Sequence, residues 1–217
     1  MPEDVPALLP VIFAVIGLGF IPFLAVMGTA FTKIVIVLML LRTALGVQTA
    51  PSTLVINSIA LTLTAFIMAP LANLMMTTVQ AEGLTMSTWE ETTEIYRIIS
   101  GIFVDHLQRF AEPKELEFFM DSAKQLWPVE MHDAINNENI FVLLPAHITS
   151  ELTKAFQIAF LLFLPFVVID MVVSNVLLAM GAMMMPPMLI SLPIKILLFV
   201  ATDGWAKLLH SLVISYA

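Results

Sequence analysis

Two charged side chains interrupt the long apolar stretches in the last third of the sequence. Asp170 follows an uncharged run from 155 to 169, and Lys195 follows another from 171 to 194. A charge in hydrocarbon is costly and usually faces a partner or a water-filled cavity. An antiparallel hairpin centred on residues 183–187 would bring both charges to nearly the same depth, at roughly 1.5 Å of rise per residue. We expect Asp170 and Lys195 to pair, within one subunit or between subunits; the alternative is that each reaches water separately.

The same turn carries the densest group of methionines. Five of the 15 methionines lie between 180 and 188, namely Met180, Met183, Met184, Met185 and Met188. Pro186 and Pro187 follow the triplet, and because a double proline cannot continue a helix, we expect a hairpin tip here. Methionine is flexible and polarizable, so a ring of such tips could seal a channel. Ordinary core packing and a Cu(I) thioether site remain alternatives, although no cysteine or nearby histidine supports copper.

Residue types with catalytic potential are scattered. The chain has no Gly-x-x-x-x-Gly-Lys phosphate loop, and its four histidines, His106, His132, His147 and His210, form no His-x-x-x-His pair. We expect each histidine to be structural, including His147 beside Ser150 and Glu151. The sequence therefore predicts no enzyme, no cofactor and no metal site.

The composition is that of a membrane protein. Of 217 residues, 59% are hydrophobic and 12% are charged, and the mean hydropathy is +0.97. Soluble domains are about 45–50% apolar and about 25% charged. A net charge of −8 argues against a nucleic-acid-binding protein, and the absence of cysteine excludes a disulfide scaffold.

The net charge lies entirely in the middle of the chain. Residues 82–144 hold 12 acidic and 4 basic side chains, whereas the flanking segments hold 5 of each. We predict three parts: an N-terminal hydrophobic helical hairpin over 1–81, an acidic helical segment over 82–144, and a C-terminal hydrophobic hairpin with a methionine-rich tip over 145–217.

The elements that position these residues are expected to be helices throughout, in an all-α fold. Crossing a bilayer takes about 20 apolar helical residues. Four stretches qualify, at about 8–41, 53–79, 152–181 and 187–214. The alternative is that these helices are buried in a large assembly. In the acidic segment, apolar residues recur at helical spacing over 95–110 and again over 116–127, with a break at Pro113.

Three further charges are expected to be buried or interfacial: Lys33, Arg42 and Asp203. The start of the chain is acidic and lacks the positive region of a signal peptide. By the positive-inside rule, Lys33 and Arg42 hold the first hairpin loop in the cytoplasm. The acidic segment 82–144 is then expected to lie outside, on the side of the membrane opposite the cytoplasm.

Several motifs resemble those of one family. They are Met27-Gly-Thr-Ala-Phe-Thr-Lys33, Leu144-Pro-Ala-His-Ile-Thr-Ser-Glu151, Pro165-Phe-Val-Val-Ile-Asp170, Ile190-Ser-Leu-Pro-Ile-Lys195 and Asp203-Gly-Trp205. Together they resemble the SctR/FliP family of the type III secretion export apparatus, and the injectisome SctR members more than the flagellar FliP members. His147 departs from the pattern, because family members usually have Phe or Tyr there.

The resemblance implies a protein-export pore. In this family five copies join SctS-like and SctT-like subunits in a ring-like helical assembly, which works with SctU-like and SctV-like components. Unfolded proteins pass through its channel, and the complex can sit largely above the membrane plane. By match to the motif, Met183, Met184 and Met185 form the gasket that closes the channel. A small-solute or copper membrane transporter is the alternative function.

Overall fold

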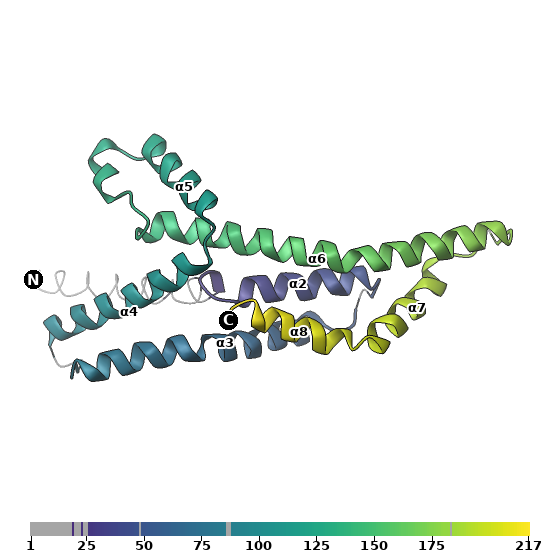
Figure 1. Cartoon of the computed structure of the whole chain (residues 1–217), viewed down its shortest axis with the longest axis horizontal. Coiled ribbons are helices and arrows are strands. Elements are labelled where there is room, and N and C mark those ends of the chain that lie inside the picture. Colours follow the sequence, from purple (N-terminus) through teal and green to yellow (C-terminus); the bar gives the residue numbers. More distant parts are fainter. Residues whose placement is uncertain (1–18, 20–22, 24–25, 48, 86–87, 183) are drawn as a thin grey trace, which may run out of the picture.

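The computed structural model describes residues 19, 23, 26–47, 49–85, 88–182 and 184–217. In these ranges every regular element is a helix, as predicted. The helices are α2 (Phe31–Ala44), α3 (Thr53–Ala81), α4 (Trp89–Phe110), α5 (Pro113–Leu126), the 3₁₀ helix η1 (Val129–Ala134), α6 (Ile140–Ala179), α7 (Met188–Ala201) and α8 (Gly204–Ile214). They form an elongated molecule in which α6 runs along most of the length (Figure 1).

The long helix α6 begins before the charges that were expected to precede it. The side chain of Asn139 accepts a hydrogen bond from the backbone N–H of Phe141 and caps the helix start. The helix then continues for 40 residues through Pro145 and Pro165, about 60 Å at 1.5 Å per residue. The predicted start at 152 was wrong, because the helix continues through the charged residues Glu151 and Lys154, and residues 140–144 are already apolar.

The helix α2 is the buried centre of the fold. Its side chains Ile34, Val37, Leu38 and Leu41 are almost fully inaccessible, and it packs against α6 and α3. A helix of 14 residues is about 21 Å long, too short to cross about 30 Å of hydrocarbon. The predicted continuous helix over 8–41 is also wrong, since a turn at 28–30 interrupts it; its first part lies largely outside the described residues.

Two described helices, α3 and α6, are long and apolar enough to cross a membrane. A third candidate arises if α7 and α8 together count as one bent span. The predicted helix over 53–79 is confirmed in α3, which the side chain of Ser52 caps. Of the four predicted spans, the described residues thus supply two or three.

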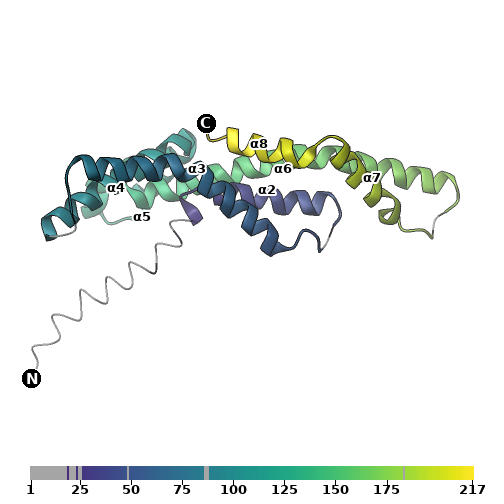
Figure 2. The same cartoon turned by 90° about the horizontal axis from the view of Figure 1, so that it is seen from below.

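The predicted helix over 187–214 is divided in two. The axes of α7 and α8 differ by 60°, and Asp203 between them has a left-handed backbone with φ of 54°. Phe199 fills the inside of the bend, packing against Phe166 and edge-on against Trp205. Figures 1 and 2 show α8 directed back along the molecule, so that the C-terminus lies near its middle.

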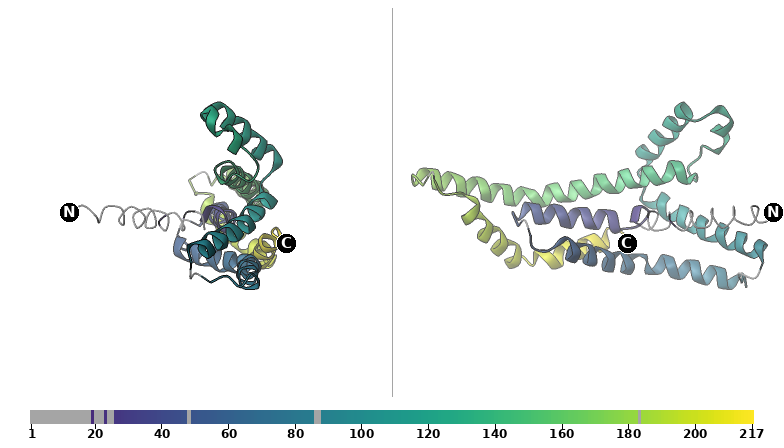
Figure 3. Two further views of the ribbon diagram at one scale, coloured as in Figure 1. Left: turned by 90° about the vertical axis from the view of Figure 1, so that its left-hand side faces the viewer. Right: turned by 180° about the vertical axis from the view of Figure 1, so that it is seen from behind.

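The acidic segment forms helices where the apolar spacing predicted them. Thr88 caps α4, and Pro113 occupies the first turn of α5. The helices α4 and α5 both contact α6, and α5 with η1 projects away from the start of α6 (Figures 1 and 3). The projecting unit of α5 and η1 is called the α5 arm below.

The bend between α7 and α8 should tolerate no side chain at Gly204. A Cβ atom there would lie 2.4 Å from ring atoms of Phe199. Because Phe199 is enclosed, we expect Gly204→Ala to lower the free energy of unfolding by about 1–3 kcal/mol. Thermal unfolding in detergent measures the effect. Gly101→Ala in α4 is the matched control: its Cβ meets nothing within 4 Å, so it should be neutral or stabilising. Equal losses in both variants would contradict this account of the bend.

Candidate functional site: two charge clusters and a methionine tip

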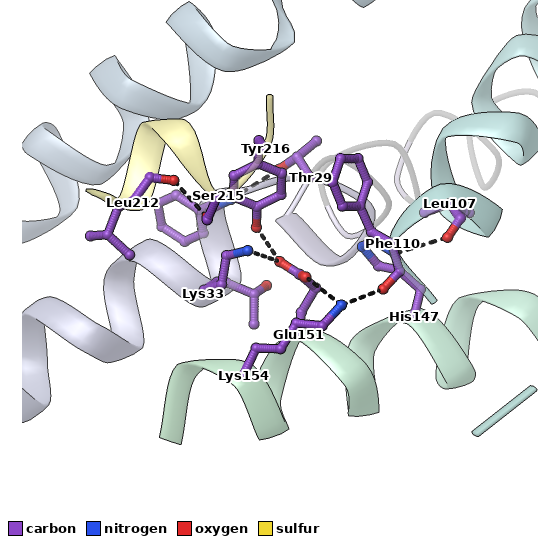
Figure 4. Close-up of polar contacts among 12 residues, drawn as sticks. Thr29, Lys33, Leu107, Phe110, His147, Glu151, Lys154, Leu212, Ser215 and Tyr216 are labelled. Atoms are coloured by element: carbon purple, nitrogen blue, oxygen red, sulfur yellow. Dashed lines mark hydrogen bonds and ion pairs between the residues drawn. The ribbon is translucent and has the colours of Figure 1, made fainter. Parts of the chain in front are cut away.

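A buried carboxylate on α6 gathers cations and donors from three parts of the chain. Glu151 is 1% exposed, and its Oε2 lies 3.3 Å from Nζ of Lys33 on α2. The hydroxyl of Tyr216, beyond the end of α8, donates a hydrogen bond to the same oxygen (Figure 4). Nζ of Lys154 lies 3.9 Å from the other oxygen, Oε1. An isolated buried carboxylate would cost several kcal/mol, so these partners allow it to remain charged.

Tyr216 serves this cluster in two ways. Its ring lies beneath the Lys33 ammonium, with 3.6 Å from Nζ to the ring centroid. Burial and the neighbouring Glu151 raise the pKa of its phenol well above the usual value, so the hydroxyl stays protonated and remains a donor. The ring of Tyr216 also packs against Phe110 of α4, at 5.0 Å between centroids. The C-terminal residues thus connect α2, α4 and α6.

Three side chains on one face of α6 hold the end of α4. His147 Nδ1 lies 3.3 Å from the carbonyl oxygen of Leu107, and Lys154 Nζ donates to the carbonyl of Phe110 at 2.9 Å. Ser150 Oγ accepts from the backbone N–H of Glu112 at 2.8 Å. The last carbonyls of a helix lack intrahelical donors, so Lys154 supplies a donor to Phe110, whereas the Leu107 carbonyl also accepts from the N–H of Ala111. His147, Ser150 and Lys154 are called the α4 clasp below.

A second histidine lies beside the clasp. The ring of His106 on α4 is 6.4 Å from that of His147 and 5.1 Å from that of Phe110, between centroids. Burial, and next the proximity of His147, lower the pKa of His106 to about 4. His106 is therefore neutral at physiological pH.

The second charge cluster joins α6, α7 and α2. Lys195 Nζ on α7 lies 2.6 Å from Oδ2 of Asp170 on α6, and it donates to the carbonyl of Ala44 at 3.2 Å. The structure thus brings together, within one chain, the two charges that were predicted to lie inside the membrane. Lys195 is buried, whereas the Asp170 side chain is 47% exposed. One edge of Asp170 is therefore open to a neighbour or to solvent.

The methionines lie where α6 turns into α7. A glycine ends α6: Gly181 has φ of 74°, and the N–H of Ala182 bonds to the carbonyl of Leu177 at 2.9 Å. The double proline was therefore the wrong stop signal, since Pro186 and Pro187 instead lead into α7. The described methionines of the tip, Met180, Met184, Met185 and Met188, are 71, 99, 48 and 49% exposed. Met183 lies outside the described residues.

The remaining charges predicted to be interfacial have separate places. Arg42 Nη1 donates to the carbonyl of Pro51 and to Oγ1 of Thr53, both at 3.3 Å, and so ties the connection between α2 and α3. Asp203 occupies the bend before α8. Lys33 was predicted to hold the first hairpin loop in the cytoplasm. It lies within α2 and is buried against Glu151. The described residues contain no group of three or more His, Cys, Asp or Glu side chains suited to a metal ion.

The cluster around Glu151 was not predicted from the sequence. Glu151 comes one residue before the apolar span predicted from 152, whereas the charges predicted to pair lie inside apolar runs. The usable signal was the spacing of His147, Ser150, Glu151 and Lys154, which puts polar groups on one helix face next to an apolar run. Nothing in the sequence links Tyr216 or His106 to that face.

Removing the Lys33 cation should lower the free energy of unfolding, and removing the charge of Glu151 as well should restore most of it. Lys33→Met leaves a buried carboxylate without its main cation, so we expect a loss of about 3–5 kcal/mol in the free energy of unfolding. In the double variant Lys33→Met/Glu151→Gln, the amide oxygen still accepts from Tyr216, and most of the loss should be recovered.

Thermal unfolding in detergent distinguishes these variants. Lys124→Met, which breaks the exposed pair with Asp121 on α5, is the control and should leave the midpoint nearly unchanged. A double variant no more stable than Lys33→Met would contradict the charge argument.

Comparison with known proteins identifies the family. The pattern of the FliP family matches residues 14–212. The Yop proteins translocation protein R of Yersinia pestis is 44% identical over 199 residues, which cover 92% of both chains. The hypersensitivity response secretion protein HrcR of Ralstonia nicotianae is 40% identical over 205 residues, covering 93% of this chain and 94% of the relative. The virulence protein YscR of Salmonella typhimurium is 36% identical over 220 residues, covering 100% and 99%. These matches extend over nearly the whole chain, which belongs to the SctR/FliP family of type III secretion proteins, as its motifs predicted.

Proposed function

We propose that this chain is the core pore subunit of a type III export apparatus and that its methionine tip closes the channel. The observation that carries the proposal is the tip itself. Four flexible apolar side chains at the end of the α6–α7 hairpin, Met180, Met184, Met185 and Met188, are about half to fully exposed among the described residues. Methionine adapts to irregular surfaces, so several tips meeting around an axis make a compliant seal. Met183, Met184 and Met185 are assigned to this gasket.

The proposed assembly contains five copies together with SctS-like and SctT-like subunits, and it works with SctU-like and SctV-like components. Unfolded secreted proteins are its cargo, and the bacterial inner membrane is its site of insertion. The acidic segment 82–144 faces the periplasm. The chain is proposed to act as a conduit, without enzymatic activity, and energy comes from its partners.

The surface of the chain supports an assembled state. Large apolar side chains are exposed along α3, α6 and α7, among them Phe66, Phe160, Leu161 and Leu197. Soluble monomers rarely expose contiguous apolar patches larger than a few hundred Å². We infer that lipid and neighbouring subunits contact this apolar surface.

Shortening the tip should open the seal. We expect complexes with Met183, Met184 and Met185 all replaced by Ala to assemble normally but to conduct small ions in a planar bilayer. The control replaces three exposed methionines far from the tip in sequence, Met27, Met76 and Met131, with Ala. Its conductance should match that of the parent. Tip variants that assemble and stay closed would refute the gasket assignment.

The Asp170–Lys195 pair should respond unequally to removal of either charge. Asp170→Asn leaves a buried ammonium without a carboxylate to neutralise it, whereas Lys195→Met leaves a carboxylate that is half exposed. We therefore expect Asp170→Asn to reduce the yield of complex co-purified with SctS-like and SctT-like subunits more strongly than Lys195→Met. Yields unchanged from the parent in both variants would show that the pair has no part in assembly.

A further inference from the structure

The junction between α4 and α6 contains two neutral imidazoles that no part of the proposed pore mechanism uses. The Nδ1–H of His147 points to the Leu107 carbonyl, so its Nε2 carries the lone pair. Nε2 of His147 and Nε2 of His106 are both buried, and neither finds a hydrogen-bond partner among the described residues. A proton added to either nitrogen in this closed arrangement would be a buried charge without an acceptor.

We propose that His106 and His147 form an acid-sensitive latch, which holds the end of α4 on α6 at neutral pH and releases α4 with the α5 arm when the pair is protonated.

Burial is the main reason that protonation is disfavoured while the junction is closed, and the nearby charges act in both directions. Lys33 from α2, Arg109 from α4 and Lys154 from α6 each act against a further positive charge. Among the described residues, the carboxylate of Glu151 on α6 favours it, and its Oε2 is already shared by Lys33 and the neutral Tyr216. From the start of α5, the contact with this face of α6 is a backbone N–H, that of Glu112. For His106, burial and the neighbouring His147 outweigh the attraction of Glu151 and lower the pKa.

Opening the junction removes this penalty. When the last turn of α4 leaves α6, water reaches both rings, and an imidazolium is no longer held beside Lys33 and Lys154. In the open state the Leu107 and Phe110 carbonyls have lost their bonds to the clasp, but water can reach both carbonyls there and solvate them. Proton binding and opening are thus linked, because the open junction binds protons more strongly than the closed one.

The direction and size of the effect follow from His106. Its pKa is about 4 when closed and close to 6.5 when open, so the closed state is fully favoured above pH 6.5 and loses its advantage as the pH falls toward 4. Between about pH 7.5 and about pH 5, this single imidazole shifts the ratio of open to closed junction by roughly 30-fold. Any contribution from His147 adds to this shift.

A distance measurement on the full chain in detergent tests the latch. The sequence contains no cysteine, so spin labels can be placed at Gly101→Cys on α4 and Thr153→Cys on α6 without other reactive sites. Both positions are exposed, and a Cβ at Gly101 meets nothing within 4 Å. We expect one distance at about pH 7.5, and a second, longer and broader population at about pH 5, with amide exchange rising over residues 107–111.

Aromatic replacements of similar size separate titration from packing. His106→Phe/His147→Phe should keep the neutral-pH distance at about pH 5, and each single variant should show a reduced shift. His132→Phe, in η1, is the matched control and should open like the parent. A parent that keeps one distance at about pH 5, or a double variant that opens as fully as the parent, would overturn the proposal. Because the measurement uses one chain, its outcome is independent of whether the chain forms an export pore.

Discussion

The charge of Glu151 is the constraint on which the described fold depends most. A carboxylate this deeply buried is stable only if cations and donors come to it, and they come from α2 and from the C-terminal residues. The neighbouring positions on the same face of α6 hold the end of α4 and the start of α5. About two turns of one helix thus hold α2, the C-terminal residues and the junction between α4 and α5, which are far apart in the sequence. The apolar core alone would not specify this arrangement, because nonpolar packing is not directional.

The second charge cluster explains how α2 fixes the positions of α6 and α7. Lys33 near the start of α2 bonds to Glu151, and the carbonyl of Ala44 at its end accepts from Lys195. Lys195 also pairs with Asp170, which follows Glu151 by 19 residues, roughly 28 Å along α6. A short helix tied at both ends in this way cannot slide along its neighbours. The buried apolar residues between the ties, from Ile34 to Leu41, fill the space that the two clusters define.

The sequence predicts helices well and their ends less well, for physical reasons that particular residues make clear. Hydropathy located α3 to within two residues because Ser52, its cap, lies directly beside the apolar run. The predicted start of α6 is twelve residues late because Glu151 and Lys154 interrupt the uncharged run, although Asn139 caps the helix well before them. Hydropathy treated α7 and α8 as one helix because it does not report backbone conformation, and the bend depends on the left-handed backbone of Asp203.

The candidate site was likewise predictable from the sequence only in part. Asp170 and Lys195 were identifiable because each is a single charge in an apolar run. The partnership of Glu151 with Tyr216 spans 65 residues, and that of His147 with Leu107 spans 40, so only the folded chain reveals them.

The two ends of α6 differ in how completely the chain itself determines them. Near Glu151, polar contacts of fixed geometry leave little freedom. Beyond Asp170, exposed apolar side chains such as Met171, Val172 and Val176 follow one another, and the tip ends in Met184 with 99% of its surface open. The Asp170–Lys195 pair fixes where the hairpin points, but no described contact fixes the tip methionine side chains themselves. The single chain therefore determines where the tip lies, whereas the packing of the tip side chains depends on the surface that contacts them. Unbranched, polarizable methionine suits this role, because it packs against irregular surfaces that a β-branched or aromatic side chain would match in one geometry only.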